Sequence, residues 1–142
     1  MKDEREEMVR EFMTHMGFGE ELKLKGETYP LKDVASILCR GMFILANEME
    51  NDDRALRLHL ILEEVVELID AMAVNDIVET ADALADLDYV VQGTAIKFGV
   101  PQLKVFKEVH RSNMTKTPGN KRRPGKENDY SPPKIKRILE RE

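Results

Sequence analysis

Apolar residues recur every three or four positions along most of the chain, which is the spacing of amphipathic helices. Glycine, proline or an Asn-Asp pair separates each such stretch from the next. No stretch alternates between apolar and polar residues for long enough to predict a sheet. The chain is therefore predicted to be all-α. The five expected helices span residues 3–16, 31 to about 49, 53–74, 77–98 and 101 to about 114.

Residues 117–133 have a different character, because prolines and glycines interrupt them repeatedly. We expect neither regular helix nor strand there, but an extended basic segment, followed by a short helix over about 133–140. A length of 142 residues fits one compact domain. The predicted organisation is a single all-α domain over 1–142, with its core in 31–116 and the extended basic tail in 117–142.

Charge is distributed unevenly along the sequence. Residues 1–103 hold 10 Lys and Arg against 22 Asp and Glu, whereas residues 104–142 hold 12 against 5. Two interpretations fit. The acidic body and basic tail are either unrelated solvated surfaces, or they share a ligand that needs cations at one end and metal-bound carboxylates at the other. A nucleoside polyphosphate is such a ligand.

The cysteine count and hydropathy narrow the setting. The single cysteine, Cys39, excludes an internal disulfide and is expected in the core. No apolar stretch approaches the ~20 residues of a membrane span, and no signal-peptide pattern opens the chain. We therefore expect a cytoplasmic protein without a membrane partner.

Acidic residues gather on the third and fourth expected helices. Spacings of three and four residues place pairs of them on one helical face. If these helices are antiparallel across the break at Asn75-Asp76, their carboxylates converge. Carboxylate oxygens suit Mg²⁺ or Mn²⁺. The alternative is an ordinary solvated acidic face. The acidic residues at these spacings are Glu63, Glu64, Glu67 and Asp70 on the third expected helix and Asp82, Asp86 and Asp88 on the fourth.

A second cluster, His110-Arg111-Ser112-Asn113-Met114-Thr115-Lys116, ends the fifth expected helix. Helical spacing lets His110, Asn113 and Lys116 address a common region. Lys116 and Arg111 can hold phosphate, and Asn113 offers both a donor and an acceptor. Alternatively, these basic residues bind no ligand and are present because the helix macrodipole favours cations at a helix C-terminus.

Three blocks follow one another in order along the chain: Glu63-Glu64-x-x-Glu67, Ala85-Asp86-Leu87-x-Tyr89-Val90, and 109–116. Together they resemble the all-α nucleoside triphosphate pyrophosphohydrolases, the superfamily of MazG-like proteins, dimeric dUTPases and phosphoribosyl-ATP pyrophosphohydrolase. The resemblance spans about residues 54–140 and is closest to the small MazG-like or phosphoribosyl-ATP pyrophosphohydrolase-like branch.

The resemblance implies a MazG-like helical bundle, a homodimer or homotetramer, that cleaves a nucleotide between its α and β phosphates with Mg²⁺, or Mn²⁺ in its place. It implies that Glu64, Glu67 and Asp86 bind the metal. Glu63 would orient or deprotonate the attacking water, or hold a second ion. Substrate contacts would come from Tyr89, Arg111, Asn113 and Lys116.

One departure from the family pattern lies on the second acidic helix. The family has E-x-x-D there, and the Glu position preceding Asp86 is Ala83 in this chain. Asp82, one residue earlier, is a plausible substitute. Residues 17–52 also exceed the expected length and could shape substrate choice or the oligomer.

The expected function is nucleotide-pool housecleaning by hydrolysis of a (deoxy)nucleoside triphosphate to the monophosphate and pyrophosphate, without nucleic acid as a partner. One alternative is phosphoribosyl-ATP hydrolysis in histidine synthesis. The other is a non-catalytic module that binds nucleotides or nucleic acid, in which the acidic helices are only surface.

Overall fold

The computed structural model describes residues 3–18, 31–120, 123–125 and 129–140. The chain forms two compact units, one from residues 24–98 and the other from residues 1–23 together with 99–142. The prediction of a single domain with a core over 31–116 stays a prediction.

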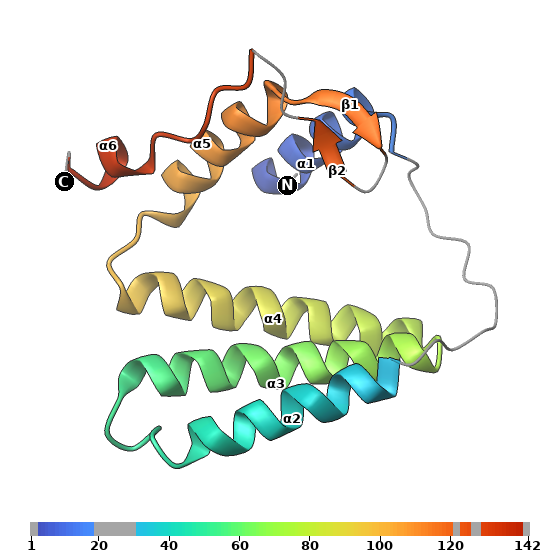
Figure 1. Ribbon diagram of the computed structural model, residues 1–142, viewed down its shortest axis with the longest axis vertical. Coiled ribbons are helices and arrows are strands. Elements are labelled where there is room, and N and C mark those ends of the chain that lie inside the picture. Colours follow the sequence, from blue (N-terminus) through green and yellow to red (C-terminus); the bar gives the residue numbers. More distant parts are fainter. Residues whose placement is uncertain (1–2, 19–30, 121–122, 126–128, 141–142) are drawn as a thin grey trace. The chain divides into compact units, whose positions relative to one another are not determined.

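Residues 24–98 contain three long helices, α2 (Leu31–Ala46), α3 (Asp53–Ala73) and α4 (Ile77–Lys97). Helix α3 packs against both α2 and α4 (Figure 1). Asp52 caps α3 by accepting a 2.8 Å hydrogen bond from the Arg54 amide. Asp76 caps α4 in the same way, and the left-handed Asn75 (φ 57°) closes the short turn between α3 and α4. The expected antiparallel pair is confirmed.

The interior of this three-helix unit is built from small side chains. The large apolar side chains are half-buried or exposed instead, and Phe43 is 75% exposed. Small residues let helices approach closely but bury little apolar area, so the unit keeps unpartnered apolar faces. The buried residues are Ala35, Ala55, Ala71, Ala73, Ala83 and Ala95.

The second unit is organised around α1 (Glu4–Met16) and α5 (Gln102–Met114), which pack together. Polar contacts fasten the pair, among them an ion pair between Lys107 on α5 and Glu4 on α1. The Glu11 carboxylate lies 3.0 Å from His110 Nε2, and His15 Nε2 lies 2.9 Å from the carbonyl oxygen of Lys116. The sequence pattern placed both helices correctly to within a few residues.

The expectation that residues 117–133 contain no strand is wrong. Strands β1 (Thr117–Asn120) and β2 (Arg123–Gly125) pair antiparallel, with an irregularity in register between Thr117 and Asn120. Each strand contains a proline, which lacks an amide donor. A two-stranded ribbon has only edge strands, so a proline is tolerated wherever its nitrogen faces away from the partner. The short helix α6 (Ile135–Leu139) follows.

The structure confirms the all-α class and adds only this ribbon within the described residues. Cys39 is exposed on α2, which corrects its expected place in the core. No helix in the described ranges is long and apolar enough to cross a membrane. Of the segment 17–52, residues 19–30 lie outside the described residues.

Candidate active site

The predicted metal ligands lie on α3 and α4, and Glu64 is the most constrained of them. Its side chain is half-buried, and its Oε2 atom is shielded from solvent with no hydrogen-bond partner in the described structure. An unsatisfied, buried carboxylate oxygen is costly and is rare in folded proteins. Glu64 therefore occupies a position that favours a cation.

The same conclusion follows from the electrostatics around Glu64. Burial is the largest cause that raises the pKa of Glu64 above its ordinary value of 4.5, and neighbouring negative charges add to it. Those charges are, in decreasing order of effect, Glu67, Asp86, Glu63 and Asp82. The fold thus brings all five predicted carboxylates into one electrostatic environment.

These carboxylates do not form a ready-made coordination shell. Among the described residues, no three His, Cys, Asp or Glu side chains are arranged so that they could hold a metal ion. The orphaned oxygen of Glu64 and the surrounding oxygen donors fit a hard divalent cation in their chemistry. The assignment of metal ligands stays a prediction.

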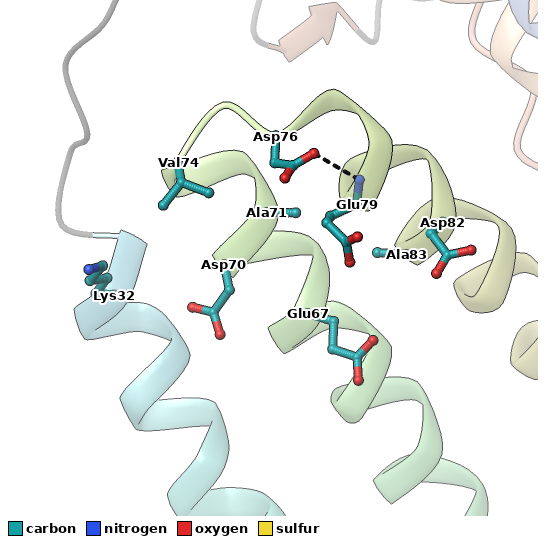
Figure 2. Close-up of a pocket in the computed structure, with 9 residues that line it drawn as sticks. All are labelled: Lys32, Glu67, Asp70, Ala71, Val74, Asp76, Glu79, Asp82 and Ala83. Atoms are coloured by element: carbon teal, nitrogen blue, oxygen red, sulfur yellow. Dashed lines mark hydrogen bonds between the residues drawn. The ribbon is translucent and has the colours of Figure 1, made fainter.

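A cavity of about 660 Å³ opens beside the turn that joins α3 and α4. Figure 2 shows its acidic side chains on both helices, with Glu67 on α3 and Asp82 on α4. Glu63, Glu64 and Asp86 do not line it. The full lining is Lys32, Glu67, Asp70, Ala71, Val74, Asp76, Glu79, Asp82 and Ala83.

Sequence reasoning missed Glu79 as part of this acidic wall. Its signal was present, because Glu79 precedes Asp82 by three residues and so shares its helical face. Ala83, where the family pattern has Glu, is only 4% exposed and lies in the wall of the cavity. Asp82 is exposed and has the weakest effect of the four charges on Glu64. Asp82 therefore lies at the edge of the cluster, and its role as a substitute for the missing Glu stays a prediction.

Arg111 is occupied by partners within its own unit. Its guanidinium donates to both Glu108 carboxylate oxygens (2.8 and 2.9 Å), to Ser131 Oγ (3.1 Å) and to the Pro132 carbonyl oxygen (3.1 Å). The hydrogen bonds from Arg111 to the Glu108 carboxylate are the main cause that lowers the pKa of Glu108 to about 2. Arg111 thus fastens the segment after β2 to α5.

Asn113 and Lys116, the other predicted phosphate contacts, hold each other. Lys116 Nζ donates a 2.6 Å hydrogen bond to Asn113 Oδ1. An ammonium group has three donors, so Lys116 keeps two for a ligand. Tyr89 on α4 is 81% exposed, so its side chain is accessible to a ligand. Each of these three contacts with substrate stays a prediction.

Residues 44–113 match the family model described as phosphoribosyl-ATP pyrophosphohydrolase. This segment runs from the last turn of α2 through most of α5, just under half of the chain, and includes all five acidic candidates. The matched family belongs to the all-α MazG-like nucleoside triphosphate pyrophosphohydrolase superfamily, and the match confirms the resemblance. The family indicates a pyrophosphohydrolase acting on phosphoribosyl-ATP or another nucleotide. No curated protein and no solved structure matches the chain.

Proposed function

We propose that this protein is a Mg²⁺-dependent pyrophosphohydrolase that cleaves a (deoxy)nucleoside triphosphate into the monophosphate and pyrophosphate. The observation that carries the proposal is the buried, unpartnered Oε2 atom of Glu64 amid four further carboxylates. Such an arrangement is unfavourable without a cation and becomes favourable with one. A role in clearing unwanted nucleotides from the pool follows from this activity.

Glu64, Glu67 and Asp86 would hold the ion, with Asp82 contributing from the edge of the cluster and Mn²⁺ able to replace Mg²⁺. When bound, the ion supplies charge neutralisation and orientation for the phosphates. Glu63 accepts a proton from the attacking water, or supports a second ion. The bond between the α and β phosphates breaks, and pyrophosphate leaves. No covalent intermediate is needed, because positioning and electrostatics carry the reaction.

Asn113 and Lys116 anchor the phosphates in this proposal, and Tyr89 contacts the nucleoside. Arg111 contributes by holding the chain around them, since four of its five donors are already engaged. The exposed apolar faces of α2 and α4 are buried in a homodimer or homotetramer. Exposed residues of these faces include Ile37, Phe43, Ile44, Leu84 and Ile96.

Hydrolysis of phosphoribosyl-ATP is the second candidate, and the description of the matching family favours it. One assay separates the two. A panel of ribo- and deoxyribonucleoside triphosphates and phosphoribosyl-ATP is tested for pyrophosphate release, with Mg²⁺ and with chelator. We expect release from at least one triphosphate with Mg²⁺ only. Turnover of phosphoribosyl-ATP with inert triphosphates would establish the second candidate instead, and no release from any compound would exclude both.

A further inference from the structure

Arg57 on α3 is a cation that the fold leaves without a partner. Its side chain is half-buried, and its Nε atom is shielded from solvent with no hydrogen-bond partner in the described structure. The other arginine and lysine of α3 and α4 are paired: Arg54 Nη2 lies 2.7 Å from Asp52, and Lys97 Nζ lies 3.6 Å from Asp53. His59 Nδ1 on α3 is also buried without a partner among the described residues. Arg57 is thus a charged donor that a ligand could satisfy.

The side chain of Arg57 lies against the backbone of α4 at Gly93. A Cβ atom added at position 93 would come within 3.3 Å of Arg57 Nη1, closer than most such contacts. The glycine therefore gives the guanidinium its place at the seam between α3 and α4. Because Gly93 is helical and has no positive φ, this close approach is the structural feature that explains a glycine here.

Arg57 and the acidic cluster share this seam. Glu64 follows Arg57 by seven residues, two helical turns or about 10 Å along α3. Asp86 precedes Gly93 by the same interval on the antiparallel α4. Helices α3 and α4 lie side by side (Figure 1). Two pairs of residues therefore face each other across the seam, two turns apart: Arg57 with Gly93, and Glu64 with Asp86. Each level presents a side-chain atom that lacks a partner, one cationic and one anionic.

We propose that Arg57 is a phosphate-binding residue, which holds an anionic group of the substrate at the end of the α3–α4 seam away from Glu64. The inference rests on the proposed function, in which the acidic end of the seam binds the phosphates through a metal ion. A nucleoside triphosphate carries the charge that both ends require. The planar guanidinium suits a phosphate because it donates two parallel hydrogen bonds.

The test measures binding of inorganic tripolyphosphate to the full chain by calorimetry in excess Mg²⁺. Arg57→Gln is expected to weaken binding about tenfold, since a hydrogen bond to a charged group is lost. Arg57→Lys is expected to recover part of the loss. Arg54→Gln is the matched control. It removes the same charge one turn away on α3, but from a residue that is already paired with Asp52. It should change the affinity less than about twofold.

Gly93→Ala provides a second variant that keeps the charge. The added Cβ displaces the guanidinium, so tripolyphosphate binding is expected to weaken about two- to threefold. This variant tests the proposal even if Arg57→Gln is too unstable to measure. Thermal unfolding and circular dichroism of each variant establish that the helices are intact.

Unchanged tripolyphosphate affinity in Arg57→Gln would overturn the inference, as would an equal loss in Arg54→Gln or no binding to the wild type. Pyrophosphate release is measured alongside, and Arg57→Gln is expected to raise KM more than it lowers kcat. The absence of release from every nucleotide by the wild-type protein contradicts the proposed function. Release with normal KM in Arg57→Gln contradicts only the role of Arg57, so the two failures are distinguishable.

Discussion

The two compact units differ in how their polar groups are satisfied. In the unit of α1 and α5, charged and polar side chains have partners within the protein: Arg111 holds Glu108, Ser131 and Pro132, and His15 meets the Lys116 carbonyl oxygen. In the unit of α2, α3 and α4, Glu64 and Arg57 each have a buried polar atom without a partner among the described residues. A folded chain satisfies the groups that only support structure, so the unsatisfied ones indicate a ligand.

The difference also has an energetic side. The α3–α4 pair gathers like charges, and its interior is built from alanines. Such a pair gives up stability to hold an acidic cluster, as functional sites commonly do. The α1–α5 pair uses its charges for fastening. Substitutions in the two pairs should therefore have different effects. Those in the α3–α4 cluster should reduce activity, and those in the α1–α5 pair should reduce local order.

The largest effect is expected from Glu64→Gln. The substitution keeps the shape of the side chain and removes the charge that would bind the ion, so Mg²⁺-dependent kcat should fall by ~10³-fold. Steady-state pyrophosphate release measures this, with Glu48→Gln, an exposed residue between α2 and α3, as the control. Full turnover by Glu64→Gln would remove Glu64 from the metal ligands.

Lys116→Ala is expected to act on substrate binding. Lys116 has free donors beside Asn113, and a phosphate anchor acts in the ground and transition states alike. KM should rise about tenfold with a smaller change in kcat. Lys136→Ala is the matched control, since that side chain is 88% exposed on α6. Unchanged KM in Lys116→Ala would show that the lysine serves α5 only.

The raised pKa of Glu64 predicts a pH-dependent difference between the wild type and Glu64→Gln in chelator. Above the raised pKa the wild type keeps a buried charge among other carboxylates, and Glu64→Gln does not, so the variant should melt higher by roughly 3 °C at neutral pH. As the pH falls through the raised pKa, Glu64 becomes protonated and this advantage should shrink, disappearing below the ordinary value of 4.5.

Thermal unfolding at a series of pH values tests this linkage. Excess Mg²⁺ at neutral pH should reverse the order by raising the melting temperature of the wild type more than that of the variant. A difference in melting temperature that stays constant with pH would show that Glu64 is not destabilised by its neighbours.

The smallest effect on activity is expected from Arg111→Ala. Because its guanidinium is engaged with Glu108, Ser131 and Pro132, KM should change less than about twofold. Loss of a direct hydrogen bond to the substrate would raise KM by more than that. Hydrogen exchange at the Lys134 amide, which donates to Glu108, should quicken instead. A KM change as large as that of Lys116→Ala would make Arg111 a substrate ligand, as the family resemblance implies.

The stability contribution of the Glu108–Arg111 pair depends on pH in the opposite direction to that of Glu64. Its stabilising effect is present above the ordinary Glu108 pKa of 4.5 and is lost as the pH falls through about 2. The faster exchange of Arg111→Ala should therefore be clearest at neutral pH and absent in strong acid.

Much of the fold could be predicted from the sequence because the determining interactions are local. The helical spacing of Leu56, Leu60 and Leu68 defined α3, and Asp52 and Asp76 supplied caps for α3 and α4. The acidic candidates were found in the same way, from spacing along two helices. The ribbon was missed because pairing of β1 with β2 is a contact between segments, which prolines in an edge strand do not forbid.

The sequence by itself determined the helices, their breaks, the acidic stripes and the similarity of residues 44–113 to a pyrophosphohydrolase family. Only the tertiary structure decided which charges are paired and which have a buried atom without a partner among the described residues. Arg111 is paired with Glu108, whereas Glu64 beside Asp86 and Arg57 against Gly93 each have such an atom. The reason is that periodicity is a property of neighbouring residues, whereas burial and pairing depend on which side chains a second helix brings near. The same residue types are therefore solvated, structural or poised for a ligand according to what packs against them.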